Sequence, residues 1–170
     1  MVMVGGPDLA SVELRPAEDA DAAFLFEVYA ASRRDPLAPL GWDSATADGF
    51  LRHRFEAEQR DWRNHNAGVE SLVVLRDGLP VGGLTLARNA HELRILDLTL
   101  LPEHCGRGIG TALIGELLRE AARTGQTVRA HVERTTPAVN LFRRLGFLHA
   151  ATRATTFLME WTPRAPVLGV

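Results

Sequence analysis

Three glycines, Gly106, Gly108 and Gly110, stand where an apolar run ends and an amphipathic pattern begins. The stretch reads LTLLPEHCGRGIGTALIGELL between Leu98 and Leu118. Glycines at such a junction of strand and helix are typical of backbone that lies close to a large anion, since the amides at a helix N-terminus attract negative charge. The sequence therefore predicts a phosphate-bearing ligand at this junction.

Three kinds of phosphate-binding loop are possible interpretations of this stretch. A Walker-type loop needs a lysine and then Ser or Thr after its last glycine, whereas Gly110 is followed directly by Thr111. A dinucleotide fingerprint fits Gly106 and Gly108 and finds an acid at Glu133, but its third glycine would fall on Thr111. The third interpretation is a pyrophosphate held by successive backbone amides at the positive end of the following helix. We favour this third interpretation.

Composition limits the classes of protein that remain. With 170 residues the chain is expected to form a single domain, 1–170, whose core covers about 12–161 between short flexible tails. A formal net charge of −2 does not favour a nucleic-acid partner. Cys105 is the one cysteine, and the histidines lack the spacing of a zinc site, so we expect no disulfide and no metal. We expect a cytoplasmic protein without a membrane span, because no run approaches roughly 18 apolar residues and the first residues do not resemble a signal peptide.

Hydrophobic periodicity and turn residues predict a mixed α/β domain in the order β-α-α-β-β-β-α-β-α-β-β. The expected strands are Val12–Arg15, two runs around the Asp77–Gly78 turn, Glu92–Leu101, Thr127–Glu133 and a last hairpin that ends in Ala154–Trp161. The expected helices lie in 18–33 with Phe24, Val28 and Ala31 on one face, from Ser44 through Trp62, over Ile109–Ala121 before Gly125, and between a Thr136 cap and Gly146. A loop is expected over Arg33–Asp43.

The glycine junction resembles motif A of the GNAT N-acetyltransferase superfamily, written R/Q-x-x-G-x-G/A, with Gly108 and Gly110 as its glycines. RRLGF at Arg143–Phe147 resembles the end of motif B, and the likeness extends from about Val12 to Trp161. The resemblance implies an α/β fold, a mixed, mostly antiparallel twisted sheet flanked by about four helices, and acetyl-CoA as co-substrate. The cofactor-binding residues that it implies are Leu98, Thr99, Leu100, Cys105, Gly106, Arg107, Gly108, Ile109, Gly110, Thr111, Thr136, Asn140, Phe142 and Arg143.

The same resemblance implies how the co-substrate is held. The strand before the glycines and the strand after the helix would splay apart, and the pantetheine arm would lie between them, bonded to backbone near Leu98 and Leu100. The acetyl group would then lie near Leu98 and Thr99, with its carbonyl polarised by a backbone amide. The implied reaction is transfer of the acetyl group from acetyl-CoA to a primary amine, by direct attack in a ternary complex.

Three positions depart from the superfamily pattern. Cys105 stands where motif A begins with Arg or Gln, which removes one long polar side chain but leaves the amide cradle. Motif B usually has an Asn near Thr135 or Thr136. Phe142 stands where a tyrosine often protonates the departing thiolate, and phenylalanine has no proton to give. A catalytically lapsed CoA-binding regulatory or interaction domain is therefore the alternative function.

Two carboxylates, Asp97 and Glu92, are candidates for the catalytic base, because an amine must lose a proton before it attacks. Asp97 lies inside an apolar run, where a charge needs a partner such as Arg94 or Arg129. Glu92 begins the same run, where a solvated acid is the commoner explanation.

We expect the acceptor pocket between the Arg33–Asp43 loop, the second helix and the last hairpin near His149–Thr155. The candidate lining residues are Trp42, Arg33, Arg34 and His53. The sequence leaves open a small-molecule amine or a protein amine as acceptor, and a homodimer as oligomeric state.

Overall fold

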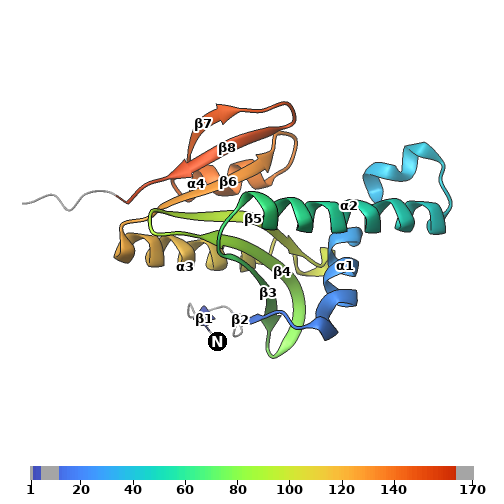
Figure 1. The fold of residues 1–170 in the computed structure, drawn as a ribbon, viewed down its shortest axis with the longest axis horizontal. Helices are drawn as coiled ribbons and strands as arrows, with labels where there is room; N and C mark the ends of the chain where they lie inside the picture. Colours follow the sequence, from blue (N-terminus) through green and yellow to red (C-terminus); the bar gives the residue numbers. More distant parts are fainter. Residues whose placement is uncertain (1, 5–11, 164–170) are drawn as a thin grey trace, which may run out of the picture.

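A computed structural model describes residues 2–4 and 12–163 (Figure 1). The strands are β1 (Val2–Val4), β2 (Val12–Pro16), β3 (Val69–Arg76), β4 (Leu79–Arg88), β5 (Glu92–Leu100), β6 (Thr127–Glu133), β7 (Leu148–Thr152) and β8 (Thr156–Trp161). The α-helices are α1 (Ala22–Ala31), α2 (Ser44–His65), α3 (Ile109–Thr124) and α4 (Ala138–Arg144). Short 3-10 turns are η1 (Asp19–Asp21), η2 (Asp35–Leu40) and η3 (Pro102–His104).

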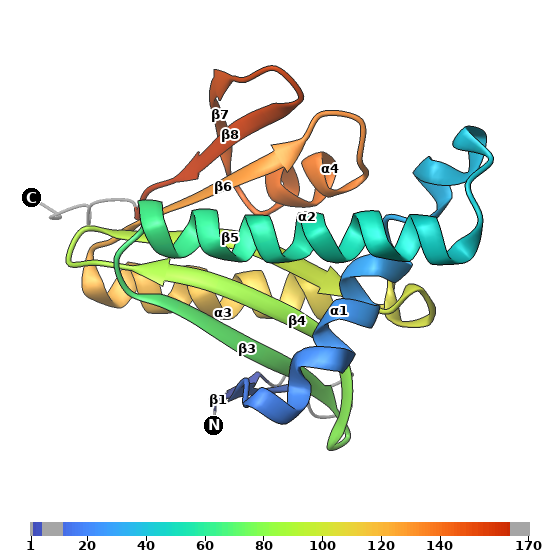
Figure 2. The ribbon, with the colours of Figure 1, turned by 45° about the vertical axis from the view of Figure 1, so that its right-hand side comes forward.

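The strands form one twisted sheet in the order β1-β2-β3-β4-β5-β6-β8-β7. Only β5 and β6 run parallel, and every other neighbouring pair of the described strands is antiparallel. Helix α3 lies behind the sheet, while α1 and α2 cross its other face, as Figures 1 and 2 show. The predicted mixed, mostly antiparallel sheet flanked by about four helices is confirmed.

Helix α3 supplies one side of the main core. Ile109, Leu113, Leu117 and Ala121 recur along one stripe and are all buried, because that stripe faces the sheet. Gly125 then ends the helix in the left-handed conformation, with φ of 71°. Both features follow the expectation from the sequence.

Helix α1 packs differently from the predicted stripe. The buried residues are Phe26, Val28, Tyr29 and Ala30, whereas Phe24 is only partly buried. The helix is covered on two sides, by the sheet and by α2, so its buried surface is wider than one stripe. A second, smaller core forms where α1 meets α2, and it contains Phe26, Tyr29, Ala30 and Leu51.

The N-terminal boundary also differs from the expectation. Strand β1 pairs antiparallel with β2, so Val2 lies opposite Leu14 and outside the core expected from about residue 12. The pairing covers the free edge of β2, which would otherwise expose unpaired backbone groups. Of the tails expected on either side of about 12–161, residues 1, 5–11 and 164–170 lie outside the described residues.

The predicted cap of α4 is wrong. The helix begins at Ala138, with Pro137 at the N-cap position. The Thr136 hydroxyl donates instead to the Glu133 carbonyl oxygen, 3.1 Å away, and thereby closes the turn that leaves β6. Across the described ranges, the helices are all too short or too polar to cross a bilayer.

Candidate active site

Strand β5 is interrupted by a bulge at Leu96. Thr85 of β4 lies opposite Asp97, and the next residue, Leu86, lies opposite Ile95, so Leu96 is an extra residue on β5. An extra residue in one strand reverses the faces of all side chains beyond it. The bulge therefore decides which way the end of β5 presents its side chains.

Because of this reversal, the Asp97 carboxylate does not point into the apolar core. Before the bulge Leu93 belongs to the core on the α3 face, and after it Leu98 and Leu100 pack against that same core. Asp97 and Thr99 consequently lie on the opposite face, in the space beneath α1 and α2. A strict two-residue alternation would have directed Asp97 into the leucine-rich core, where an isolated charge is strongly unfavourable.

The parallel pairing of β5 with β6 is short. It runs from Glu92 opposite Thr127 to Ile95 opposite Ala130 and ends there. Strand β5 continues along β4 to Leu100, and β6 continues along β8, so the two strands diverge. Backbone groups along the diverging edges can bond an extended amide chain laid between them.

The N-terminus of α3 opens beside this divergence. Gly106 and Gly108 have φ values of 68° and 80°, a conformation that other residues adopt rarely. The first helical hydrogen bond runs from the Ala112 N–H to the Gly108 carbonyl oxygen, at 2.9 Å. The amides of Ile109, Gly110 and Thr111 precede it in the first turn, where donors have no partner inside the helix. Unpaired amides of this kind can bind an anion.

Helix α4 borders the same loop. A methyl group built on Gly110 would lie 3.5 Å from Leu141 Cδ2, so α4 lies directly beside the start of α3. Asn140 and Arg143 are exposed on α4, whereas Phe142 is only 6% exposed and packs edge-on against Phe147 at 4.9 Å. The phenyl ring at this position is part of the core.

Cys105 lies exposed between η3 and the glycines, with Arg107 also exposed beyond it. Its Sγ is 3.6 Å from the Leu101 carbonyl oxygen. Partial burial and the nearby Glu103 carboxylate raise the pKa of this thiol. A raised pKa disfavours the reactive thiolate, so the thiol is better explained as a small residue than as a redox group.

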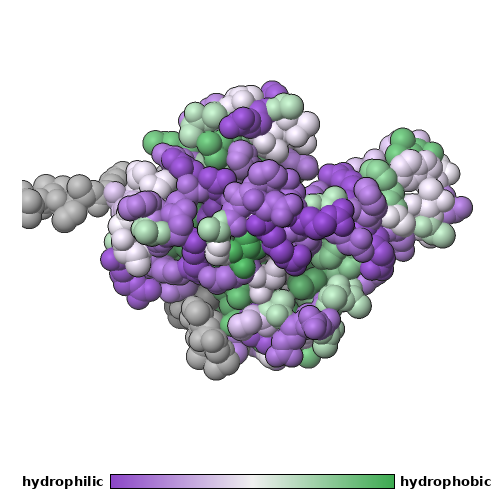
Figure 3. All heavy atoms as spheres, viewed as in Figure 1, coloured by the Kyte–Doolittle hydropathy of each residue, from purple (hydrophilic) through white to green (hydrophobic). Residues whose placement is uncertain are grey.

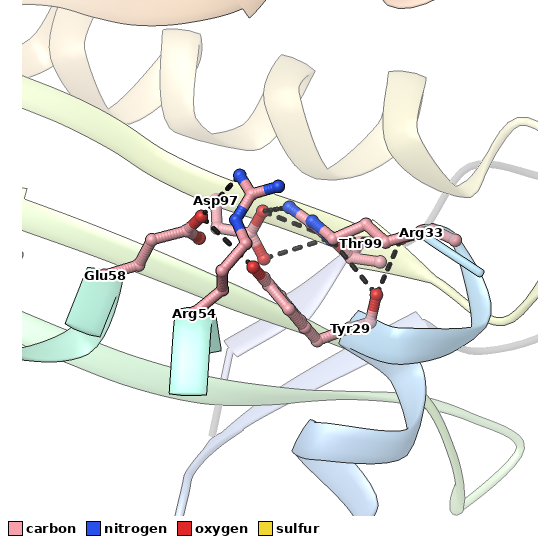
Figure 4. A network of polar contacts seen from close by, with 7 residues as sticks. Tyr29, Arg33, Arg54, Glu58, Asp97 and Thr99 are labelled. Carbon is pink, nitrogen blue, oxygen red and sulfur yellow. Dashed lines mark hydrogen bonds and ion pairs between the residues drawn. The ribbon is translucent and has the colours of Figure 1, made fainter. Parts of the chain in front are cut away.

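Asp97 sits in a polar network (Figure 4). The Thr99 hydroxyl lies 3.0 and 3.1 Å from its two carboxylate oxygens, and Arg33 Nη2 lies 3.4 Å from Oδ1. The predicted partners, Arg94 and Arg129, are wrong for Asp97 because both bind another acid. Burial raises the pKa of Asp97 more than Arg33 and Thr99 lower it.

A second carboxylate from α2 adjoins this network. The Tyr29 hydroxyl donates to Glu58 Oε1 at 3.1 Å, and Arg54 lies 3.3 Å from the same oxygen. Burial, together with the Glu58 charge, raises the pKa of Tyr29 to about 12. Tyr29 is the one tyrosine in the chain, and it lies beneath α2 rather than on α4.

A small cavity of about 20 Å³ lies between these groups and the sheet. Its polar lining comes from Asp97 and Thr99 on β5, Thr85 on β4, Ser71 on β3 and Gln59 on α2. The volume suits a single water molecule, and the polar groups would satisfy it. The enclosed side of the sheet that carries Asp97 therefore holds several polar groups among apolar side chains.

Glu92 has a different environment. Its carboxylate binds Arg94 Nε at 2.6 Å and Arg129 Nη1 at 2.7 Å. Burial acts against ionisation, but the two arginines outweigh it and lower the pKa of Glu92. The residue lies where β5 and β6 are still paired, at the opposite end of β5 from Asp97. The structure thus brings Asp97, and not Glu92, to the diverging strands.

The expected acceptor loop is partly ordered as η2 and projects beyond the sheet with the start of α2 (Figure 1). A cavity of about 330 Å³ lies there, lined by Arg34, Leu37, Ala38, Trp42, Ser44, Ala47 and Asp48. Trp42 is 42% exposed and packs against Phe50, while His53 lies exposed on α2. Figure 3 shows hydrophobic residues on this projection beside the hydrophilic outer surface of α2. The structure therefore separates Trp42 from the enclosed site around Asp97.

The last hairpin, β7–β8, supplies no lining residue to either of these two cavities. His149 packs edge-on against Phe157 at 4.8 Å and contacts the Thr152 hydroxyl at 3.0 Å. Within the ranges that the structure describes, no three His, Cys, Asp or Glu side chains gather to hold a metal ion.

The sequence did not indicate Tyr29, Glu58 and Arg54 as site residues. The available signal was the single tyrosine, placed between apolar helix residues, and a charge pair spaced i, i+4 on α2. Neither pattern relates α1 to α2, because the two helices meet only in the tertiary structure.

Comparison with known families agrees with this geometry. The model of the acetyltransferase (GNAT) family matches residues 34–147. The match covers more than half of the chain, and it contains both the glycine loop and the Arg143–Phe147 segment. The protein therefore belongs to the GNAT acetyltransferase family.

Individual relatives are more distant. The chain is 36% identical over 118 residues to a mycothiol acetyltransferase from Nocardiopsis dassonvillei, covering 69% of this chain and 32% of that protein. The chain thus spans about a third of the length of this relative. The fold also resembles PaiA N-acetyltransferase from Thermoplasma acidophilum in complex with coenzyme A. That structure has a TM-score of 0.69 and 23% identity, over 89% of this chain and 99% of the other. It likewise resembles YncA from Salmonella typhimurium with acetyl-CoA, with a TM-score of 0.54 and 22% identity, over 94% and 98%.

Proposed function

We propose that the protein transfers an acetyl group from acetyl-CoA to a primary amine, by direct attack within a ternary complex. One observation carries the proposal: the diverging strands β5 and β6 lead to the glycine-bounded N-terminus of α3, and Asp97 lies beside the divergence. Two of the structural relatives hold coenzyme A or acetyl-CoA, which supports the same co-substrate here.

The residues present fit this co-substrate. The amides from Gly106 to Thr111 would bind its pyrophosphate, since they lie at a helix N-terminus, where unpaired N–H groups attract an anion. The β5 backbone near Leu98 and Leu100, no longer paired to β6, would bind the pantetheine arm. When bound, acetyl-CoA supplies an acetyl thioester that an amine can attack.

Asp97 is proposed to receive the proton that the amine loses. Its carboxylate is held by Thr99 and lies in a partly enclosed space that contains other polar groups, so it can face an ammonium group without full exposure to water. Starting from the ammonium form, the nitrogen loses one proton to Asp97 before it attacks. It loses a second proton to solvent as the nitrogen–carbon bond forms and the carbon–sulfur bond breaks, and the departing thiolate takes up one proton. Glu92 is proposed only as a structural partner of Arg94 and Arg129.

Protonation of the departing thiolate is assigned to water or to the substrate. Phe142 has no proton to give, and the Tyr29 phenol is hydrogen-bonded to Glu58 with a pKa of about 12. A thiol has a pKa of about 8.5, so its thiolate leaves readily without an enzyme acid. The same absence of a phenol on α4 favours one second candidate, a CoA-binding domain that has lost catalysis.

The acceptor is proposed to be a small-molecule amine or a protein amine. The likeness to a mycothiol acetyltransferase places small-molecule amines first in a screen. Thiol release from acetyl-CoA, measured with alkylamines, amino acids and peptides with free amino termini, would identify the acceptor. Binding of acetyl-CoA without thiol release from any of these would favour the lapsed candidate.

Calorimetric titration tests the proposal directly. Acetyl-CoA is expected to bind, whereas NAD and ATP serve as controls and are expected not to bind. Binding of NAD alone would contradict the proposal and favour the dinucleotide interpretation of the glycine loop.

A matched pair of variants locates the site. Gly108→Ala and Gly125→Ala both put a side chain at a left-handed position, with φ of 80° and 71°, at opposite ends of α3. Each is expected to cost about 1–2 kcal/mol of stability for the backbone conformation. Only Gly108→Ala is expected to weaken acetyl-CoA binding, by at least about tenfold, since of the two ends of α3 only the N-terminal loop is proposed to bind the pyrophosphate. Equal affinities for acetyl-CoA in the two variants would contradict the proposal that the glycine loop binds the pyrophosphate.

A further inference from the structure

We propose that Arg33 is a positioning residue, which holds the Asp97 carboxylate ionised and oriented for proton transfer from the amine. The inference rests on the proposed function, because it gives Arg33 a role that is exerted through Asp97. The geometry that carries it is a guanidinium fixed by α1 and directed at a carboxylate beneath that helix (Figure 4).

Arg33 is anchored independently of Asp97. Its guanidinium carbon lies 3.8 Å from the centre of the Tyr29 ring, a distance typical of a cation–π contact. Its Nη1 donates to the Tyr29 carbonyl oxygen at 3.3 Å and to the Ser32 hydroxyl at 3.0 Å. These contacts lie at the C-terminal end of α1, where the helix dipole favours a positive charge. The guanidinium would therefore stay in place even without the carboxylate.

The other terminal nitrogen of the guanidinium group, Nη2, points at Asp97. Arg33 Nη2 lies 3.4 Å from Asp97 Oδ1, and the two side chains are 28% and 22% exposed. Solvent and salt screen such a partly enclosed pair less than a surface pair. The distance is long for a hydrogen bond, so the contact acts mainly through charge.

The other groups around Asp97 favour its protonated form or are uncharged. From α2, the Glu58 carboxylate faces Asp97 with like charge and is itself bound to Tyr29 and Arg54. From the sheet, Thr85 on β4 and Thr99 on β5 are polar but do not ionise. Among the residues that the structure describes, Arg33 makes the one ion pair with Asp97. Without it, burial and the Glu58 charge would both favour the protonated form of Asp97, opposed by the Thr99 hydroxyl, and the pKa of Asp97 would rise further.

The neighbouring arginine provides a matched control. Arg34 lies 3.0 Å from Asp48 and 3.3 Å from Glu27, on the outer side of the same turn. Its replacement removes one positive charge from the same segment without touching the Asp97 network. Arg33→Met removes the charge and keeps an unbranched side chain over the Tyr29 ring, and Arg33→Lys keeps the charge.

The test is a titration of the Asp97 carboxyl carbon by NMR in the full chain labelled with ¹³C-aspartate, with Asp97→Asn to assign the resonance. In Arg33→Met the pKa of Asp97 is expected to rise by about one unit or more, since an opposite charge this close lowers a carboxyl pKa by about 1–3 units. Arg33→Lys is expected to restore most of the shift, and Arg34→Met to leave the pKa unchanged. An unchanged pKa in a folded Arg33→Met protein would overturn the inference.

Kinetics then separate this inference from the proposed function. With the primary amine from the screen that releases thiol fastest, the acid limb of the rate profile is expected to move to higher pH in Arg33→Met, by the shift that NMR measures. If NMR shows the shift but the acid limb stays in place, Arg33 has no catalytic role and the inference fails. Failure of the proposed function itself would appear separately, as absence of acetyl-CoA binding to the wild-type protein.

Discussion

An alanine substitution at Gly82 tests how closely β4 and β5 approach where β5 ends. Gly82 lies opposite Leu100, and both strands are fully paired there. A Cβ at position 82 would lie 2.6 Å from Leu100 Cδ2 and 2.6 Å from the Thr99 carbonyl oxygen. Real Cβ atoms essentially never lie within 3.0 Å of another heavy atom, so both contacts must widen. The leucine can rotate, but the carbonyl belongs to the strand and must carry the backbone with it.

Forced overpacking of this kind costs about 1–3 kcal/mol. In a protein of this size, 1 kcal/mol lowers the melting temperature by about 2–4 °C, so a cost of about 2 kcal/mol predicts a fall of about 4–8 °C. The same displacement moves the β5 edge that we propose binds the pantetheine arm. The affinity for acetyl-CoA should therefore fall together with stability.

Substitution of Gly49 by alanine is the same chemical change, but it is expected to raise the stability of the protein rather than lower it. Gly49 lies inside α2, and a Cβ there would have no neighbour within 4 Å. Alanine is favoured over glycine in a helix by about 1 kcal/mol, so Gly49→Ala should raise the melting temperature by about 2–4 °C. Urea and thermal unfolding, followed by far-UV circular dichroism, compare the two variants with wild type. A Gly82→Ala protein as stable as wild type would refute the close approach of the strands.

Three further predictions concern the site and the pH dependence. Asp97→Asn is expected to lower the rate of acetyl transfer by about 10²–10⁴-fold while acetyl-CoA binding in calorimetry stays intact, and a near wild-type rate would exclude proton transfer to Asp97. Phe142→Tyr is expected to raise the rate of thiol release by up to about 100-fold if protonation of the thiolate limits it, and no gain would show that another step is limiting. Asp21 has a pKa of about 2, below its usual 3.8, because Arg15 and the Glu18 amide bond its carboxylate. The stability that it contributes is present above pH 3.8 and is lost as the pH falls towards 2, so urea midpoints should fall more steeply there in wild type than in Asp21→Asn.

The local patterns of the chain were sufficient for much of the fold. The apolar residues of α3 recur at the helical period and are bounded by glycines, so both its position and its buried face follow from the sequence. The turn at Asp77 and Gly78 likewise predicts the β3–β4 hairpin, and it is formed as expected. These features depend on residues close together in the chain, which is why one sequence determines them.

Strand β5 shows where local patterns were insufficient. The run from Glu92 to Leu100 contains no glycine or proline that would indicate a bulge at Leu96. The bulge arises from pairing with β4, and it decides that Asp97 faces α1 rather than α3. For that reason the sequence indicated Asp97 as a candidate but predicted Arg94 and Arg129 as its partners, whereas both arginines bind Glu92.

What the sequence alone determined was the glycine loop at the start of α3 and the family to which that loop belongs. Only the tertiary structure brought Arg33 to Asp97, which is 64 residues away, and placed Tyr29 beneath Glu58. Ion pairs between distant segments depend on how helices pack on the sheet, and no local period encodes that packing. The environment that sets the charge of Asp97 is accordingly a property of the folded protein.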